Sequence, residues 1–169
     1  MQLILSQLGD RHPLLRRHPV NYARSGALAL HRAGHRSPTT LRILEDAAER
    51  SAQLAWQSVG SSDLLLPATD EKRITEYGAE AIALAYVNET DTWVVKRRGQ
   101  QGESADWLLQ NPSGVLALEV SGLKEGNAGN ARTRLNEKKL QLAKCTLPVS
   151  KRLAVIVEFA SPTLSAGAV

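Results

Sequence analysis

Cysteine and aromatic residues are scarce in this sequence of 169 residues. The single cysteine, Cys145, excludes a disulfide within the chain and a zinc site built from several cysteines, which suits a reducing compartment. Aromatic residues make up 4% of the chain, so few rings are available to stack on single-stranded bases. The histidines follow no zinc-site spacing, and we expect them to be exposed to solvent or to cap helices. They are His12, His18, His31 and His35.

Long apolar runs are also missing. No stretch approaches the roughly 18 consecutive apolar residues of a membrane-spanning helix. The first residues, MQLILSQLGDRHPLLRRH, do not show the basic segment followed by a long apolar segment that marks a signal peptide. We therefore expect a cytoplasmic protein without contact to a membrane.

The overall composition is that of a folded protein with a basic excess. Hydrophobic residues account for 43% and charged residues for 22% of the chain, which is long enough for one domain with a sizeable core. There are 21 Lys and Arg residues against 17 Asp and Glu residues. This excess is compatible with a polyanionic partner but does not by itself identify one.

Residues 1–68 are rich in arginine and histidine and have a helical pattern over 38–59. Ser37 can cap a helix whose first residue is Pro38, and apolar residues then recur at spacings of three and four. We expect residues 1–68 to form a helical extension that packs on the rest of the protein.

Residues 69–160 are predicted to form the core, and residues 161–169 a frayed tail. The predicted core elements are a helix from Asp70 to Val87, strands over 92–98, 105–110 and 115–122, a helix over 131–144 and a strand over 152–160. Short turns favour antiparallel pairing of the first three strands, and the helix before the last strand favours one parallel pairing. The sequence thus predicts an α/β fold with a small mixed sheet and helices on its faces.

Two acidic residues lie inside apolar strands, in the segment ADWLLQNPSGVLALEV. Asp106 begins the second predicted strand and Glu119 lies near the end of the third. If these strands pair through the NPSG turn, both carboxylates lie at the same end of the sheet. Neighbouring buried carboxylates repel each other, so one must be protonated or a cation must lie between them. Mg²⁺ is the hard divalent ion that suits such a pair. The alternative is that Asp106 only starts a strand and that Glu119 faces solvent.

This arrangement resembles the PD-(D/E)XK nuclease superfamily, the restriction-endonuclease-like fold, over residues 70–160. The resemblance implies an αβββαβ core and hydrolysis of phosphodiester bonds in DNA with Mg²⁺, for which Mn²⁺ can substitute. It implies that Asp106, Glu119 and the carbonyl group of Val120 bind the metal. It also implies a further acid from the first helix, Glu76 or Glu80.

Of these two helix residues we favour Glu80, which lies deeper in the helix. Ser121 stands where the superfamily has its motif lysine, two residues after the glutamate. The resemblance implies that another lysine takes over this role, and the candidates are Lys124, Lys138 and Lys139, with Lys96 more remote. The helix over 131–144 is predicted to contact the phosphate backbone. Its contact residues would be Arg132, Arg134, Lys138 and Lys139.

Because Ser121 cannot carry a positive charge, a second function stays open: a nuclease-fold protein without activity that binds nucleic acid or protein. An active site should place Asp106, Glu119 and one ammonium group around a common point, whereas a degenerate site should pair Glu119 with an Arg or Lys. An unrelated interaction module would follow if residues 91–122 did not form an antiparallel meander. The N-terminal helices could hold a second copy of the chain or a partner subunit.

Overall fold

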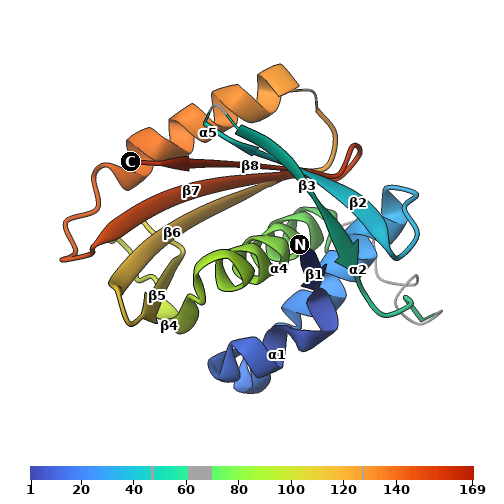
Figure 1. Ribbon diagram of the computed structural model, residues 1–169, viewed down its shortest axis with the longest axis horizontal. Helices are drawn as coiled ribbons and strands as arrows, with labels where there is room; N and C mark the ends of the chain where they lie inside the picture. The colour runs from blue at the N-terminus through green and yellow to red at the C-terminus, as the bar shows by residue number, and fades with distance from the viewer. Residues whose placement is uncertain (47, 61–69, 127) are drawn as a thin grey trace.

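A mixed sheet of eight strands runs through the molecule, with helices on both faces (Figure 1). The computed structural model describes residues 1–46, 48–60, 70–126 and 128–169. Helix α5 (Ala128–Leu142) covers one face of the sheet, whereas α4 (Glu71–Asp91) packs on the other face and α2 (Tyr22–Arg32) packs on α4. The fold is therefore mixed α/β, as the sequence predicts.

The remaining elements follow from the N-terminus to the C-terminus. The strands are β1 (Gln2–Ile4), β2 (Thr39–Glu45), β3 (Ala48–Ala55), β4 (Val94–Arg98), β5 (Trp107–Asn111), β6 (Gly114–Leu123), β7 (Lys151–Glu158) and β8 (Thr163–Ala168). The short helices are η1 (Leu5–Gln7), α1 (Leu8–Arg11) and η2 (Pro13–Arg17).

The strand order across the sheet is β1-β3-β2-β8-β7-β6-β5-β4. Strands β4, β5 and β6 form an antiparallel meander directly after α4. Helix α5 then crosses over to β7, which pairs parallel to β6. These pairings confirm the predicted order of a helix, three antiparallel strands, a second helix and a parallel strand. They also exclude the alternative in which residues 91–122 form no meander.

Side chains of β6 alternate between the two faces of the sheet. Leu118 belongs to the main apolar core, which includes α4, whereas Ala117 packs in a second cluster with Leu142 of α5. Since successive residues of a strand point to opposite faces, Glu119 and Ser121 lie on the α5 face. The fold thus places these two polar residues between the central strands and α5.

Helix α2 crosses α4 at two glycines. A Cβ atom on Gly78 would lie 3.2 Å from the Cα atom of Gly26, so a side chain at this position would push the two helices apart by a few tenths of an ångström. This contact fixes α2, and the segment before it, against the side of α4.

The N-terminal helices are attached to the core by a buried histidine. One ring nitrogen of His12 lies 3.1 Å from the carbonyl oxygen of Leu84 on α4, and the other accepts a hydrogen bond of 3.2 Å from the amide of Val95 on β4. The side chain is 0% exposed, and burial lowers its pKa to about 4. The expectation of an exposed or capping histidine is wrong at this position.

Two other expectations are wrong. Residues 38–59 do not form a helix, because β2 and β3 pair there as an antiparallel hairpin. Leu41 and Ile43 are both 0% exposed while Arg42 between them is exposed, which is the period of a strand. The tail is not frayed either: β8 lies between β2 and β7 and pairs with both. Of the predicted helical extension, residues 61–68 lie outside the described residues.

Candidate active site

Asp106 and Glu119 come together across β5 and β6. The amide of Asp106 donates a hydrogen bond of 2.9 Å to the carbonyl of Leu118, which continues the pairing of Trp107 with Leu118. The Oδ2 atom of Asp106 accepts a hydrogen bond of 2.8 Å from the amide of Val120. The backbone of β6 therefore holds the Asp106 carboxylate at the level of Glu119.

Glu119 is 2% exposed and sits between a negative and a positive neighbour. Burial raises the pKa of the Glu119 carboxyl group, and the negative charge of Asp106 raises it further. The ammonium group of Lys138 on α5 opposes this rise, at 2.6 Å from Oε1 of Glu119. Gln141, one turn further along α5, donates a hydrogen bond of 2.8 Å to the same oxygen.

Ser121 lies beside a second cation from α5. The Nε atom of Arg134 donates a hydrogen bond of 3.2 Å to Oγ of Ser121, and its Nη1 atom donates one of 3.0 Å to Glu137. Arg134 and Lys138 are four residues apart on one face of α5, as Glu119 and Ser121 are two residues apart on one face of β6. Helix α5 thus places a positive charge beside the side chain of Ser121.

Glu80 reaches the same region from α4 and is 6% exposed. Its two oxygens accept hydrogen bonds from Arg98, at 2.7 and 3.1 Å, and Oε2 also accepts one of 2.7 Å from the indole of Trp107. Burial raises the pKa of Glu80, Arg98 opposes the rise, and the charge of Asp106 adds to it. Glu80 therefore holds Arg98 at the end of β4 and Trp107 at the start of β5, and hydrogen bonds engage both of its carboxylate oxygens. Glu76, the alternative, is exposed and lies 4.0 Å from Lys72.

A cluster that sequence reasoning missed surrounds Arg98. The guanidinium group of Arg98 lies 4.8 Å from the centre of the Trp107 ring and donates a hydrogen bond of 2.8 Å to the hydroxyl of Tyr22. Tyr22 in turn lies 5.2 Å from His18, ring centre to ring centre. Through these contacts, the segment joining η2 to α2 becomes a neighbour of the carboxylate pair. No local sequence pattern identifies this cluster, because it depends on the register that sets Arg98 opposite Trp107 and on the position of Tyr22.

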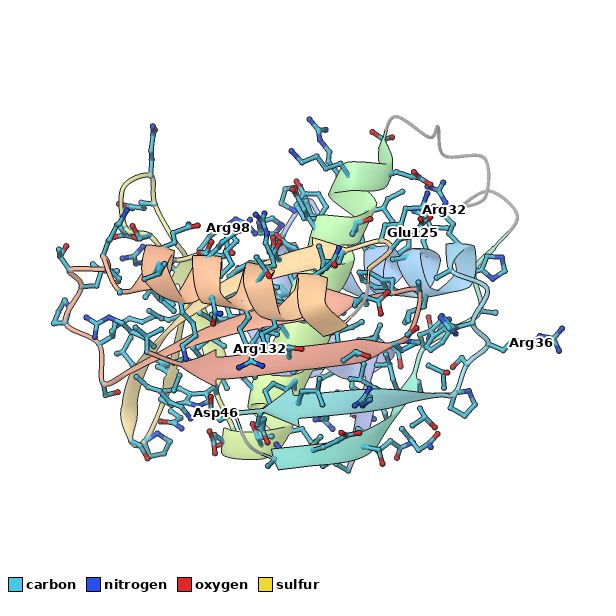
Figure 2. All side chains as sticks on the ribbon, turned by 90° about the horizontal axis from the view of Figure 1, so that it is seen from above. Arg32, Arg36, Asp46, Arg98, Glu125 and Arg132 are labelled. Carbon is cyan, nitrogen blue, oxygen red and sulfur yellow. The ribbon has the colours of Figure 1, made fainter. Side chains whose placement is uncertain are left out.

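Three predicted site residues lie elsewhere. Lys124 pairs with Glu71 at 3.1 Å, at the start of α4. The side chain of Lys139 lies over Gly167 on β8. Arg132 is exposed, and in Figure 2 it lies on the opposite side of α5 from Arg98. Of the candidate lysines, Lys138 is therefore the one that contacts Glu119.

The donor atoms at this site suit a hard divalent cation. Mg²⁺ in proteins is commonly bound by one or two carboxylates, with waters and substrate oxygens completing its shell. Asp106 and Glu119 supply two carboxylates; Lys138 forms an ion pair with Glu119, and Arg98 interacts electrostatically with Asp106. Across the described ranges, no group of three or more His, Cys, Asp and Glu side chains is placed to hold a metal ion.

The sequence-based criterion for a degenerate site is met, because the ammonium group of Lys138 pairs with Glu119 at 2.6 Å. The same pair brings an ammonium group next to one of the two acids, which an active site also requires.

Comparisons with known proteins identify no relative of this chain. No protein-family model, no curated protein and no solved structure matches this chain. None of the helices that the structure describes has the length and apolar character needed to cross a bilayer.

Proposed function

We propose that this protein is a Mg²⁺-dependent nuclease that hydrolyses phosphodiester bonds of DNA. The observation that carries the proposal is the approach of two carboxylates: the backbone of β6 holds Asp106 beside Glu119, and the negative charge of Asp106 raises the pKa of Glu119. A divalent cation between the two carboxylates would relieve this repulsion and explain why both acids are tolerated at this end of the strands.

The order of elements supports a restriction-endonuclease-like core. Helix α4, the meander β4-β5-β6, the crossover helix α5 and the parallel strand β7 follow one another as in an αβββαβ arrangement. Asp106, directly before β5, and Glu119 in β6 would correspond to the two acids of that core. This support is at the level of the fold, so the function depends on the site itself.

Asp106, Glu119 and the carbonyl group of Val120 would hold the metal. When bound, Mg²⁺, or Mn²⁺ in its place, polarises the phosphate and lowers the pKa of a bound water. Gln141 fixes the orientation of the Glu119 carboxylate through its hydrogen bond of 2.8 Å. Glu80 positions the segment that carries Asp106 by holding the neighbouring Trp107.

Lys138 would take the role of the missing motif lysine. Its side chain is 15% exposed and its ammonium group lies 2.6 Å from Glu119, where it would orient the attacking water and offset negative charge that develops on the phosphate. Arg134 beside Ser121 adds a second positive charge one helical turn away.

The exposed side of α5 would contact the DNA backbone. Arg132, Arg134 and Lys139 lie on this helix, and the chain carries a net charge of +4. Such contacts are independent of sequence and weaken with salt. A homodimer or a partner subunit bound through the N-terminal helices stays a prediction.

The test combines calorimetric titration of Mg²⁺ and Mn²⁺ with a plasmid-nicking assay on the same preparations. Wild type should bind Mn²⁺ and nick, and Glu119→Ala should do neither. Lys138→Met should lower the nicking rate by about 10² to 10³-fold, the usual cost of removing one group that stabilises developing negative charge. Lys151→Met is the matched control, since this lysine is likewise in an ion pair, with Asp91 at 3.1 Å.

A protein that keeps the fold without catalysis is the second candidate. It is favoured by the Lys138–Glu119 ion pair, which can neutralise the glutamate by itself. Wild type that neither binds Mn²⁺ nor nicks would refute the nuclease and support this candidate.

A further inference from the structure

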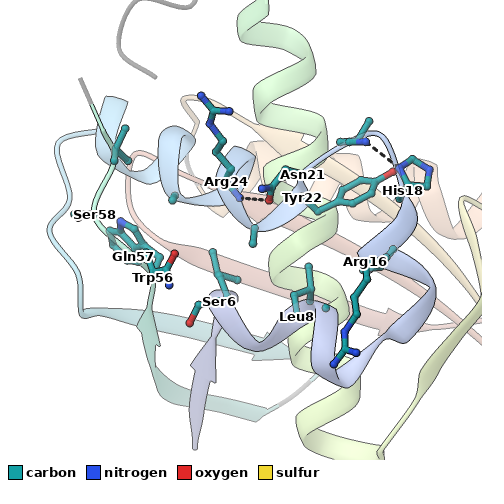
Figure 3. A pocket seen from close by; sticks show the side chains of 17 residues that line it. Ser6, Leu8, Arg16, His18, Asn21, Tyr22, Arg24, Trp56, Gln57 and Ser58 are labelled. Carbon is teal, nitrogen blue, oxygen red and sulfur yellow. Dashed lines mark hydrogen bonds between the residues drawn. The ribbon is translucent and has the colours of Figure 1, made fainter. Parts of the chain in front are cut away.

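His18, in the segment between η2 and α2, has a ring whose position is set by three contacts. The centre of the ring lies 5.2 Å from that of Tyr22 and 6.3 Å from that of Trp107. The amide of Val20 donates a hydrogen bond of 3.2 Å to Nδ1 of His18, which is drawn in Figure 3. The fold therefore fixes where this ring lies and how it is turned.

The hydrogen bond from Val20 decides which nitrogen of His18 carries the proton. Since Nδ1 accepts from the amide, the neutral ring has its proton on Nε2, which becomes a hydrogen-bond donor. Burial and the charge of Arg98 both lower the pKa of His18 below its ordinary value of 6.5, so the ring is neutral at pH 7. The ring thus presents a single N–H group with a fixed direction.

This N–H group is open to solvent. Within the described part of the chain, Nε2 of His18 has no hydrogen-bond partner. The one buried side-chain nitrogen or oxygen without a partner there is Nε of Arg152, so Nε2 of His18 is not buried. His18 also lines a cavity of about 430 Å³ between the N-terminal helices, α2 and the segment that follows β3 (Figure 3). A donor that is fixed in advance and gives up only water loses little entropy when it binds a ligand oxygen.

Arg98 links His18 to the carboxylate site through its charge. The guanidinium group lowers the pKa of His18 and is near enough to Asp106 for their charges to interact. Trp107, against which the ring of His18 lies, directly follows Asp106 in the chain. Arg98 itself is paired with Glu80 at 2.7 Å. The donor that this side of the site offers to a substrate is therefore that of His18.

We propose that Nε2 of His18 donates a hydrogen bond to a phosphate oxygen of the DNA strand, beside the bond that is cleaved. This inference rests on the proposed nuclease function and adds a substrate-binding residue on the face of the sheet that α4 covers, opposite α5. Phosphate and sugar oxygens accept half to two-thirds of all protein–DNA hydrogen bonds. A hydrogen bond to an ionised acceptor is also about twice as strong as one between neutral groups.

The binding test measures the affinity for a fluorescein-labelled oligonucleotide at pH 8, without metal and over a series of salt concentrations. His18→Phe keeps a ring against Tyr22 and Trp107 but removes both nitrogens, and it should weaken binding about tenfold or more. The salt slope should not change, because a neutral donor releases no counterion. His18→Gln, whose amide can supply a donor near the position of Nε2, should recover part of the affinity. His31→Phe, at an exposed position on α2, is the matched control.

Cleavage by the same variants separates this inference from the nuclease function. With Mn²⁺, His18→Phe should raise KM for the oligonucleotide and leave kcat unchanged, as the loss of uniform binding does. Equal affinity of wild type and His18→Phe, a lower salt slope in that variant, or no binding by wild type would overturn the role given to His18 even if plasmid is nicked. A loss of affinity that His18→Gln restores, without any cleavage by wild type, would support the phosphate contact and refute the nuclease.

Discussion

Protonation of His12 should destabilise the fold in mild acid, because this ring joins the N-terminal helices to the core. Its ring lies between a carbonyl, which can only accept, and an amide, which can only donate. The neutral ring with its proton on the nitrogen facing Leu84 satisfies both partners, since the other nitrogen then accepts from Val95. A second proton would break the bond to Val95 and place a charge in the core.

The magnitude follows from the shift of the pKa from 6.5 to about 4 in the folded protein. The unfolded chain binds the proton first as the pH falls, so the stabilisation is complete above pH 6.5 and is lost toward pH 4. At about 1.4 kcal/mol for each pKa unit, the loss amounts to about 3 kcal/mol. This is a large part of the stability of a small protein.

The assay is urea unfolding of wild type and His12→Gln at a series of pH values between 7 and 4. The variant should be less stable than wild type at pH 7, and the difference should shrink as the pH falls because the variant has no ring to protonate. His31→Gln, at an exposed position on α2, is the matched control. A constant difference between wild type and His12→Gln across this range would refute the reasoning.

Three further predictions concern β6, α5 and their contacts. Adding Ser121→Lys to Lys138→Met should restore part of the nicking activity, because residue 121 lies on the same face of β6 as Glu119; no recovery would contradict the role given to Lys138. Gly122→Ala should destabilise the fold by about 1 to 3 kcal/mol in urea unfolding, as overpacking does, since its Cβ would lie 2.5 Å from the carbonyl oxygen of Thr75 on α4. Arg132→Ala should lower the salt slope of DNA binding by about one, as loss of one phosphate contact does; an unchanged slope would remove this residue from the interface.

The elements that sequence reasoning found are those with strong local signals. Helix α4 and strands β4 to β7 have a clear period or a continuous apolar run with short turns between them. Strand β8 was missed because its small residues carry no such signal, and only pairing with β2 and β7 buries Leu164 and Ala166. Over 38–59, alanines at helical spacing favour a helix in the sequence, although β2 and β3 have the alternation of strands in the structure.

In the candidate site, as in the fold, some residues could be predicted from the sequence and others could not. Asp106 and Glu119 could be predicted because an acid in an apolar strand is costly wherever that strand lies. The Arg98–Tyr22 contact joins residues 76 positions apart and depends on how α2 crosses α4, which no local pattern encodes. Lys138 was one of several candidates, and only the packing of α5 on β6 selects it.

That packing also explains how a serine can stand at position 121. Glu119 and Ser121 lie side by side on the α5 face of β6. Lys138 of α5 contacts Glu119, and Arg134 of α5 contacts Ser121. A lysine on β6 or on α5 can bring its ammonium group to the carboxylates, because both elements line the space between them. The proposed nuclease needs a positive charge beside Glu119, and Lys138, one turn after Arg134 on α5, supplies that charge as well as a lysine at position 121 would.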